Sequence, residues 1–198
     1  MKAEGPLFIP TIIQQKGGVI QAFDPFSLLL QQRVIFLTGE IHEFNASLLI
    51  AQMLYLSSEK SSEAIHFYIQ SPGGQLKPGL AIYDLMGYVR CPIATYGMGG
   101  VSSMATVLLA AGTKGMRYAL PNATMMMHQP SGGAYGPADD VAIVAEEIKR
   151  AKTVLYDILS KHTGKSVEQL TADFQRDNFM NAQAACAYGI IDEVLQRK

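Results

Sequence analysis

The sequence predicts a single α/β domain in which strands and helices alternate. Its 198 residues are enough for one sizeable core, and neither a composition shift nor an internal repeat marks a second domain. Short apolar or alternating segments, typical of strands, are separated by segments with helical periodicity. This alternation favours a layered α/β fold without deciding which one.

The N-terminal part of the chain differs from the rest. Residues 1–22 contain two adjacent glycines and several glutamines and show no clear period. We therefore expect an irregular N-terminal arm there, in which a short cleaved propeptide is one alternative, and a single domain over 23–198. A capped start at Asp24-Pro25 opens that domain.

In the first half of the domain, strand and helix patterns follow one another. The run 34–37 is continuously apolar, as in a buried strand, and 45–56 places its apolar side chains on one helical stripe. Apolar and polar residues alternate over 65–69, which is a strand pattern. A helix over 80–89 and a strand over 93–96 are expected next.

The second half begins with a helix predicted over 103–111, which ends at Gly112, a residue type common just after helices. Two strands follow, 117–120 and 124–127, and a Pro-Asn turn separates them. The same alternation of elements therefore continues past the middle of the chain.

A long helix is predicted over 137–162, and Pro137 suits its first position. Helices near 166–174 and 181–188 and a strand over 190–195 complete the expected elements. The domain thus ends, as it begins, with short elements.

Charge and hydropathy exclude several classes of partner. The net charge is −1, with 16 basic and 17 acidic residues, and no basic run exceeds two residues. Nucleic acid or an anionic membrane would need a concentrated positive face. No signal peptide or apolar span of 18 residues is present, so we expect a soluble protein of a reducing compartment.

The low content of charged residues suggests subunit contacts. Charged residues make up 17% of the chain, against about 25% in typical soluble domains, and hydrophobic residues reach 48%. An oligomer that hides surface between subunits explains the shortage better than an apolar monomer does. Cys91 and Cys186 have no metal-ligand spacing, and we expect two small buried hydrophobic residues rather than a disulfide.

A candidate nucleophile lies where a glycine-rich turn meets an apolar helix. Ser103 at a helix N-terminus would gain from free N–H groups and the positive end of the helix dipole. The N–H of Met104 would then serve an oxyanion, and Gly74, in a turn after a strand, would let the backbone approach a substrate. A serine in this place is more often only an N-cap, and Ser102 is an equally good cap.

The partners that a serine nucleophile needs are also present, but the pattern does not single them out. His128 follows a Met-rich strand, yet His42, His66 and His162 compete with it as general base. Asp177 could orient the base or merely cap the segment that follows it. From the residues alone, the chain is a serine-hydrolase candidate.

Four motifs, in register, resemble the ClpP caseinolytic proteases. They are Tyr-Ile-Gln-Ser-Pro-Gly-Gly at 68–74, the Ser-Ser-Met segment at 102–112, the Met-Met-Met-His-Gln-Pro segment at 120–133, and Arg-Asp-Asn-Phe-Met at 176–180 followed by 188–192. The similarity extends from about Ile9 to Leu195. Such a set of ordered motifs is specific.

The resemblance implies a role for each candidate residue. Ser103 matches the family's nucleophile, which separates it from Ser102; His128 matches the general base and Asp177 the orienting carboxylate. The backbone N–H groups of Gly74 and Met104 match the oxyanion hole. The implied reaction is peptide cleavage through an acyl-enzyme.

The resemblance also implies the fold and the assembly. The family fold is a crotonase-like spiral of ββα units, with a long handle helix, here 137–162, between two stacked seven-membered rings. A strand beside that helix would line the substrate groove; its residues would be Gly132, Gly133, Ala134 and Tyr135. A Clp-type AAA+ unfoldase would supply unfolded substrates. No phosphate-binding loop is present, so ATP would be used by that partner and no cofactor by this chain.

Several positions depart from the family pattern. At the unfoldase docking cleft Tyr68 and Tyr88 match family aromatics, but His66 replaces an aromatic residue and could make docking weaker or pH-sensitive, or simply pack like a ring. Gln175 stands where many members have an acid that pairs with Arg176 across the rings. Further departures, at Val101-Ser102, Ala105, Leu28 and 16–22, indicate a divergent paralogue.

Two other functions remain open. The chain could be a weakly active or structural subunit that needs a sister subunit in mixed rings. It could, more remotely, be a crotonase-like acyl-CoA enzyme, although that would leave Ser103, His128 and Asp177 unexplained. The bacterial cytoplasm and the plastid stroma are the compartments that the resemblance implies.

Overall fold

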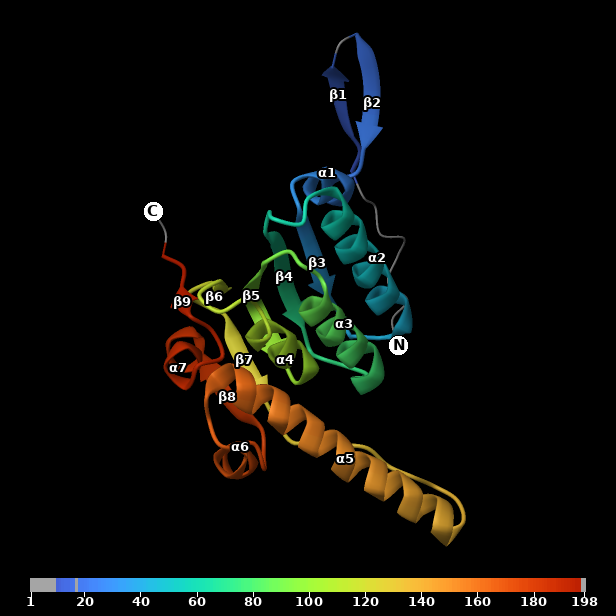
Figure 1. Cartoon of the computed structure of the whole chain (residues 1–198), viewed down its shortest axis with the longest axis vertical. Coiled ribbons are helices and arrows are strands. Elements are labelled where there is room, and N and C mark those ends of the chain that lie inside the picture. Colours follow the sequence, from blue (N-terminus) through green and yellow to red (C-terminus); the bar gives the residue numbers. More distant parts are fainter. Residues whose placement is uncertain (1–9, 17, 197–198) are drawn as a thin grey trace.

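The computed structural model describes residues 10–16 and 18–196, so the first nine residues of the expected arm lie outside the described residues. Figure 1 shows a central sheet with helices packed on it, a hairpin at one end and a long helix projecting from the other. The predicted α/β class is confirmed.

The arm is a β-hairpin rather than an irregular segment. Strands β1 (Ile12–Lys16) and β2 (Val19–Phe23) pair antiparallel, and Gly18 has a φ of +81° in the turn between them. The prediction of an irregular arm is therefore wrong for these residues. Strand periodicity arises when one face is buried, and here Ile13 and Ile20 are both about 70% exposed (71% and 69%), so the sequence has no such pattern.

The main sheet is mostly parallel. Its strands run in the order β3-β4-β5-β6-β9, while β7 pairs in parallel with the end of β5, and β8 pairs antiparallel with β7. The strands are β3 (Val34–Thr38), β4 (Ile65–Ser71), β5 (Ile93–Ser102), β6 (Arg117–Ala119), β7 (Thr124–Met127), β8 (Asn178–Asn181) and β9 (Glu193–Val194).

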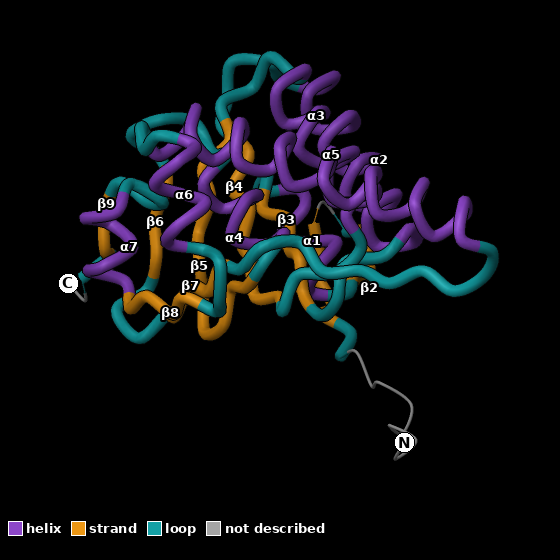
Figure 2. Tube along the Cα trace, turned by 90° about the horizontal axis from the view of Figure 1, so that it is seen from below, coloured by secondary structure: helices purple, strands orange, loops and turns teal. Residues whose placement is uncertain are grey.

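Seven helices connect and cover these strands within the described residues. They are α1 (Pro25–Gln31), α2 (Glu43–Glu59), α3 (Leu76–Tyr88), α4 (Met104–Ala110), α5 (Ala138–Thr163), α6 (Val167–Asp173) and α7 (Ala182–Tyr188). Figure 2 shows most of the helices on one side of the strands. No helix among the described residues is both long and apolar enough to cross a bilayer.

The two faces of the sheet have different surroundings. Ile35 and Phe67 point toward the helices and are at most 1% exposed. On the other face, Phe36, Tyr68, Tyr96 and Tyr118 lie opposite one another on β3 to β6 and are only half-buried. Their rings stack, with centroids 5.6, 4.4 and 5.1 Å apart from one strand to the next; we call these four residues the aromatic row.

Several observed elements differ from the predicted ones. Strand β5 continues to Ser102 instead of ending near residue 96, because glycines in its second half weaken the strand pattern although they pair with β4 and β7. Strand β8 was not predicted, and β9 covers only two residues of the predicted 190–195. The cysteines Cys91 and Cys186 are both free thiols, as expected, but only Cys91 is buried; Cys186 is partly exposed.

The long helix is confirmed as α5, but the strand expected beside it at 132–135 is not present. This segment has no regular structure; it precedes α5 in the chain and runs beside it as a loop (Figure 1). Gly132 lies close to the side chain of Ile148, and Tyr135 is fully exposed. A strand needs a neighbouring strand for its backbone hydrogen bonds, and this segment has a helix beside it instead.

A buried arginine joins the ends of several elements. Arg117 is 4% exposed, and its guanidinium forms an ion pair with Asp192, with Nε 2.8 Å from Oδ2. It also donates to the carbonyl oxygens of Ala110, His162 and Gly189. Arg117 therefore fixes the C-terminal ends of α4, α5 and α7 to strand β6.

Candidate active site

A strained turn presents Ser103 between β5 and α4. Ser103 has φ +54° and ψ −126°, a region that non-glycine residues rarely adopt. Its N–H donates to the carbonyl oxygen of Met126 at 2.8 Å, and the buried hydroxyl of Thr106 lies 2.9 Å from the same oxygen. All seven residues of α4 are buried, so packing holds this turn, which we call the elbow, in its conformation.

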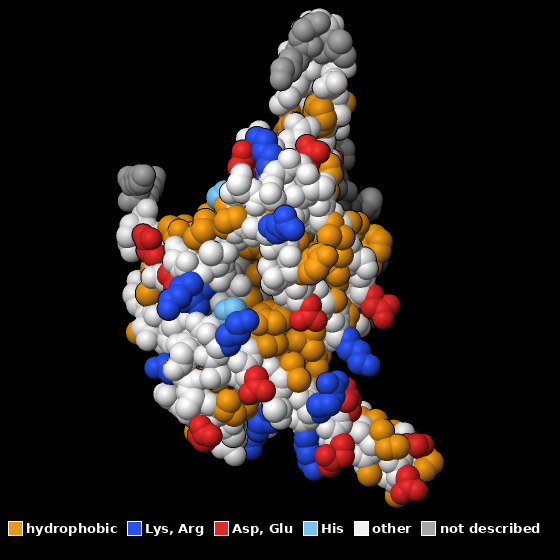
Figure 3. All heavy atoms as spheres, viewed as in Figure 1, with side chains coloured by type: hydrophobic (Ala, Val, Ile, Leu, Met, Phe, Trp, Pro, Cys, Tyr) orange, Lys and Arg blue, Asp and Glu red, His pale blue; other side chains and the backbone are white. Residues whose placement is uncertain are grey.

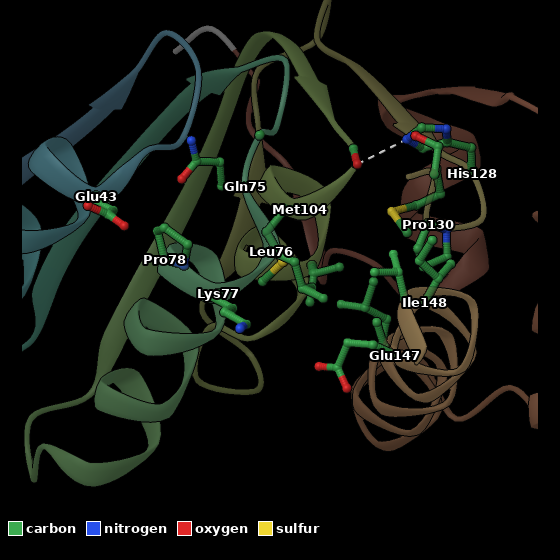
Figure 4. A pocket seen from close by; sticks show the side chains of 18 of the residues that line it. Glu43, Gln75, Leu76, Lys77, Pro78, Met104, His128, Pro130, Glu147 and Ile148 are labelled. Atoms are coloured by element: carbon green, nitrogen blue, oxygen red, sulfur yellow. Dashed lines mark hydrogen bonds between the residues drawn. The ribbon is translucent and has the colours of Figure 1, made fainter. Parts of the chain in front are cut away.

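Sheet pairing brings His128 to the elbow. Residue Ser102 at the end of β5 is opposite Met126 on β7, so the residues just after these strand ends are neighbours. His128 Nε2 lies 3.0 Å from Ser103 Oγ, which is hydrogen-bond distance (Figure 4). The imidazole is therefore placed to accept the hydroxyl proton.

The antiparallel strand β8 brings Asp177 to the other side of His128. Asn178 pairs with Met127, so the residues next to them, Asp177 and His128, are also adjacent. Asp177 Oδ1 lies 3.7 Å from His128 Nδ1, which is ion-pair distance but longer than a hydrogen bond. The Asp177 side chain is 62% exposed. The three residues predicted from the sequence are thus brought together, with the carboxylate the least constrained of them.

Two backbone N–H groups beside the cavity have no acceptor among the described residues. Within the described residues, neither Gly74 nor Met104 donates its N–H to a protein acceptor, and both residues line the cavity beside Ser103. Gly73 makes this approach possible: a Cβ there would lie 2.8 Å from the Cβ of Ser103 and 2.7 Å from the oxygen of Ser102. Sequence analysis did not single out Gly73, although its place in the Pro-Gly-Gly turn was the available signal.

A cavity of about 620 Å³ opens next to Ser103 and His128. Its wall is mostly apolar, which suits an apolar substrate side chain, and its volume is in the range of small-ligand sites. In Figure 4, Leu76 and Met104 lie on one side and Pro130 and Ile148 on the other. The charged side chains of Glu43, Lys77 and Glu147 also line it.

The competing histidines lie elsewhere. His42 is at the N-terminus of α2. His162 is near the end of α5, 3.2 Å from the Tyr83 hydroxyl, and burial, with the nearby charges of Lys161 and Arg117, lowers its pKa to about 4. It is therefore a neutral packed histidine. Ser102, the competing serine, is the last residue of β5 and has no histidine partner among the described residues.

The residues expected to dock an unfoldase lie on or near the exposed face of the sheet. Tyr68 belongs to the aromatic row, and the Nδ1 of His66 lies 2.9 Å from the hydroxyl of Tyr96 in that row. His66 therefore packs beside the aromatic row, as an aromatic residue at this position would. Tyr88, at the end of α3, is 81% exposed. Arg176, for which the resemblance implies a contact between rings, and its neighbour Gln175 are both exposed in the turn before β8.

Within the described part of the chain, no three His, Cys, Asp or Glu residues are grouped closely enough to hold a metal ion.

One comparison with known proteins bears on this site. The family model for Clp protease matches residues 15–198. This range includes the elbow, the segments that carry His128 and Asp177, helix α5 and the aromatic row. The match covers far more than half of the chain.

Proposed function

Because the chain belongs to the Clp protease family, whose members are serine peptidases, we propose that Ser103, His128 and Asp177 are its nucleophile, general base and orienting carboxylate. The observation that supports this most strongly is the 3.0 Å contact between Ser103 Oγ and His128 Nε2. The contact occurs at a strained turn beside an apolar cavity, as expected for an activated serine. The Ser103 side chain makes no capping hydrogen bond, so capping of α4 does not account for this residue.

Peptide cleavage would proceed by acyl transfer. As Ser103 Oγ attacks the substrate carbonyl carbon, its proton passes to His128 Nε2, and the oxyanion accepts hydrogen bonds from the N–H groups of Gly74 and Met104. When the C–N bond breaks, His128 returns the proton to the leaving amine. Water then attacks the acyl ester with the same base, which releases the acid and restores Ser103.

An extended substrate would lie along the loop that includes Gly132, Gly133, Ala134 and Tyr135. This segment pairs with no strand among the described residues, so its backbone would be free to pair with a peptide, while the cavity would accept one apolar side chain. Pairing of this kind recognises backbone rather than sequence. It suits an endopeptidase that cuts unfolded polypeptides into short peptides.

The active unit would be an oligomer of two stacked heptameric rings. Its support is the exposed apolar surface of a chain with few charges: Figure 3 shows hydrophobic side chains on the visible face. Ile143 on α5 is 68% exposed and Phe179 on β8 is 66% exposed. Helix α5 would interdigitate between rings, and Arg176 would contact a neighbouring subunit.

A Clp-type AAA+ unfoldase would dock on the aromatic row, on Tyr88 and on His66, and would use the ATP. The partly exposed rings offer an apolar surface with polar edges, which is typical of docking sites. This chain would need no cofactor. Such an assembly would work in the bacterial cytoplasm or the plastid stroma, the compartments that the resemblance implies.

A second candidate function is a subunit that is competent only with a sister subunit. The exposed Asp177, 3.7 Å from His128, favours it, because a contact in mixed rings could complete the alignment. Gln175, in place of the family's acid, points the same way. The acyl-CoA alternative has no such support.

The test is hydrolysis of a fluorogenic peptide with an apolar residue before the cleaved bond. Ser103→Ala and His128→Gln are each expected to lower kcat by at least about a thousandfold, while the matched control Ser102→Ala keeps most activity. Loss of activity in Ser102→Ala but not in Ser103→Ala would contradict the assignment. Activity that appears only after mixing with a sister subunit would favour the second candidate.

A further inference from the structure

The Asp177 carboxylate has little to hold it in place. Its side chain is 62% exposed, and the ion pair with His128 at 3.7 Å is the one polar interaction of this side chain among the described residues. No hydrogen bond to this carboxylate occurs within residues 10–16 and 18–196. Its position therefore depends on the backbone that carries it.

Burial and strand pairing fix the two ends of that backbone. On one side Phe174 is fully buried and ends α6. On the other side Asn178 pairs with Met127 and donates from Nδ2 to the oxygen of Asp173 at 3.1 Å. The residues between, 175–177, are all exposed.

Gln129, the residue after His128, joins the two segments. Its Nε2 donates to the backbone oxygen of Gln175 at 3.1 Å, and its Oε1 lies 3.5 Å from Nζ of Lys152 on α5. Lys152 Nζ in turn lies 5.4 Å from the ring centre of the buried Tyr156. Gln129 therefore has contacts on both the aspartate segment and the handle helix.

Only an amide satisfies both neighbours of this side chain. The carbonyl of Gln175 accepts a hydrogen bond, whereas the ammonium of Lys152 donates one. The reverse amide orientation would place oxygen against oxygen and NH₂ against ammonium. A carboxylate or an aliphatic side chain of the same length would lose the bond to Gln175.

We propose that Gln129 is a positioning residue that holds the Asp177 segment against His128, with Lys152 fixing its orientation from α5. This inference rests on the proposed function, because it concerns the alignment of the same three residues. Gln129 does not line the cavity beside Ser103. It therefore acts on the alignment of the base and not on the binding of substrate.

Two variants of Gln129 test the role of its amide. Gln129→Met keeps the length and removes both polar contacts; Gln129→Glu keeps an acceptor for Lys152 but cannot donate to Gln175. Both are expected to lower kcat about tenfold, since misplacement by about 1 Å can cost up to about a hundredfold, and to leave KM within about twofold. Gln169→Met, at an exposed glutamine of α6, is the matched control and keeps full activity.

A double-mutant cycle separates positioning from a general structural role. In an Asp177→Ala background, with the rate of Ser103 modification by a fluorophosphonate as readout, Gln129→Met is expected to cause no further loss. A further tenfold loss in that background, or a raised KM with unchanged kcat, would overturn the inference while the proposed function stands. An inactive wild-type assembly would overturn the proposed function and this inference with it.

Discussion

The strain at the elbow has a measurable cost in stability. Ser103 has a φ of +54° with a ψ of −126°, and a non-glycine residue in such a region costs about 1–3 kcal/mol. Ser103→Gly removes that cost, and Ser103→Ala retains it. Neither replacement loses an N-cap, because the Ser103 side chain makes no capping hydrogen bond.

The net effect is the difference between two opposing terms. Glycine has more conformational freedom in the unfolded chain, which offsets about 0.5–1 kcal/mol of the gain. Both variants lose the same contact with His128, so comparing them cancels that term. We therefore expect Ser103→Gly to have a free energy of unfolding about 1 kcal/mol higher than that of Ser103→Ala.

Urea denaturation followed by far-UV circular dichroism measures this difference. All proteins need the same concentration, because subunit association contributes to apparent stability. Equal stability of Ser103→Gly and Ser103→Ala, or a less stable glycine variant, would show that the elbow is not strained. The reasoning from backbone geometry to function would then be refuted at this residue.

Three further predictions concern residues around the site and the core. Gly73→Ala would place a Cβ 2.8 Å from that of the elbow serine at a φ of +92°, so peptide hydrolysis should fall about a hundredfold, whereas Gly87→Ala, which meets nothing within 4 Å, should leave the rate unchanged. The pKa of His162 is lowered to about 4 in the folded state, so the unfolded state takes up this proton first as the pH falls below about 6.5. The free energy of unfolding should therefore drop by about 1–2 kcal/mol from pH 7 to pH 5, and a His162→Phe variant that shows the same drop would contradict this. Arg117→Met leaves the Asp192 carboxylate without its partner and should destabilise the fold by about 3–5 kcal/mol in urea denaturation; a loss below about 1 kcal/mol would count against the joining role of this arginine.

The sequence predicts those elements whose buried side chains form an apolar run or a regular apolar pattern. Strands β3 and β7 are mainly apolar runs, and β4 and the long helix α5 have apolar residues at the strand and helix periods. The observed bounds of all four differ from the predicted ones by only a few residues. The β1–β2 hairpin and the second half of β5 have no such pattern. Their hydrogen bonds depend on neighbouring strands, which local sequence does not reveal.

The candidate site was predictable only through its motifs. Local patterns do not distinguish Ser103 from Ser102, since both precede the same helix, and only the pairing of β5 with β7 places one of them 3.0 Å from His128. Gly73 and Gln129 act through contacts with segments that are far from them in the chain. Such contacts become visible only when the fold brings the segments together.

The central claim is that Ser103 is an activated nucleophile, and a covalent probe tests it most directly. The wild-type protein is incubated with a fluorophosphonate and the adduct is located by peptide mass spectrometry, with Ser103→Ala and Ser102→Ala as paired controls. We expect an adduct on Ser103 that is absent from Ser103→Ala and retained in Ser102→Ala. A folded, ring-sized wild-type sample without an adduct on Ser103 would contradict the claim for this chain acting alone.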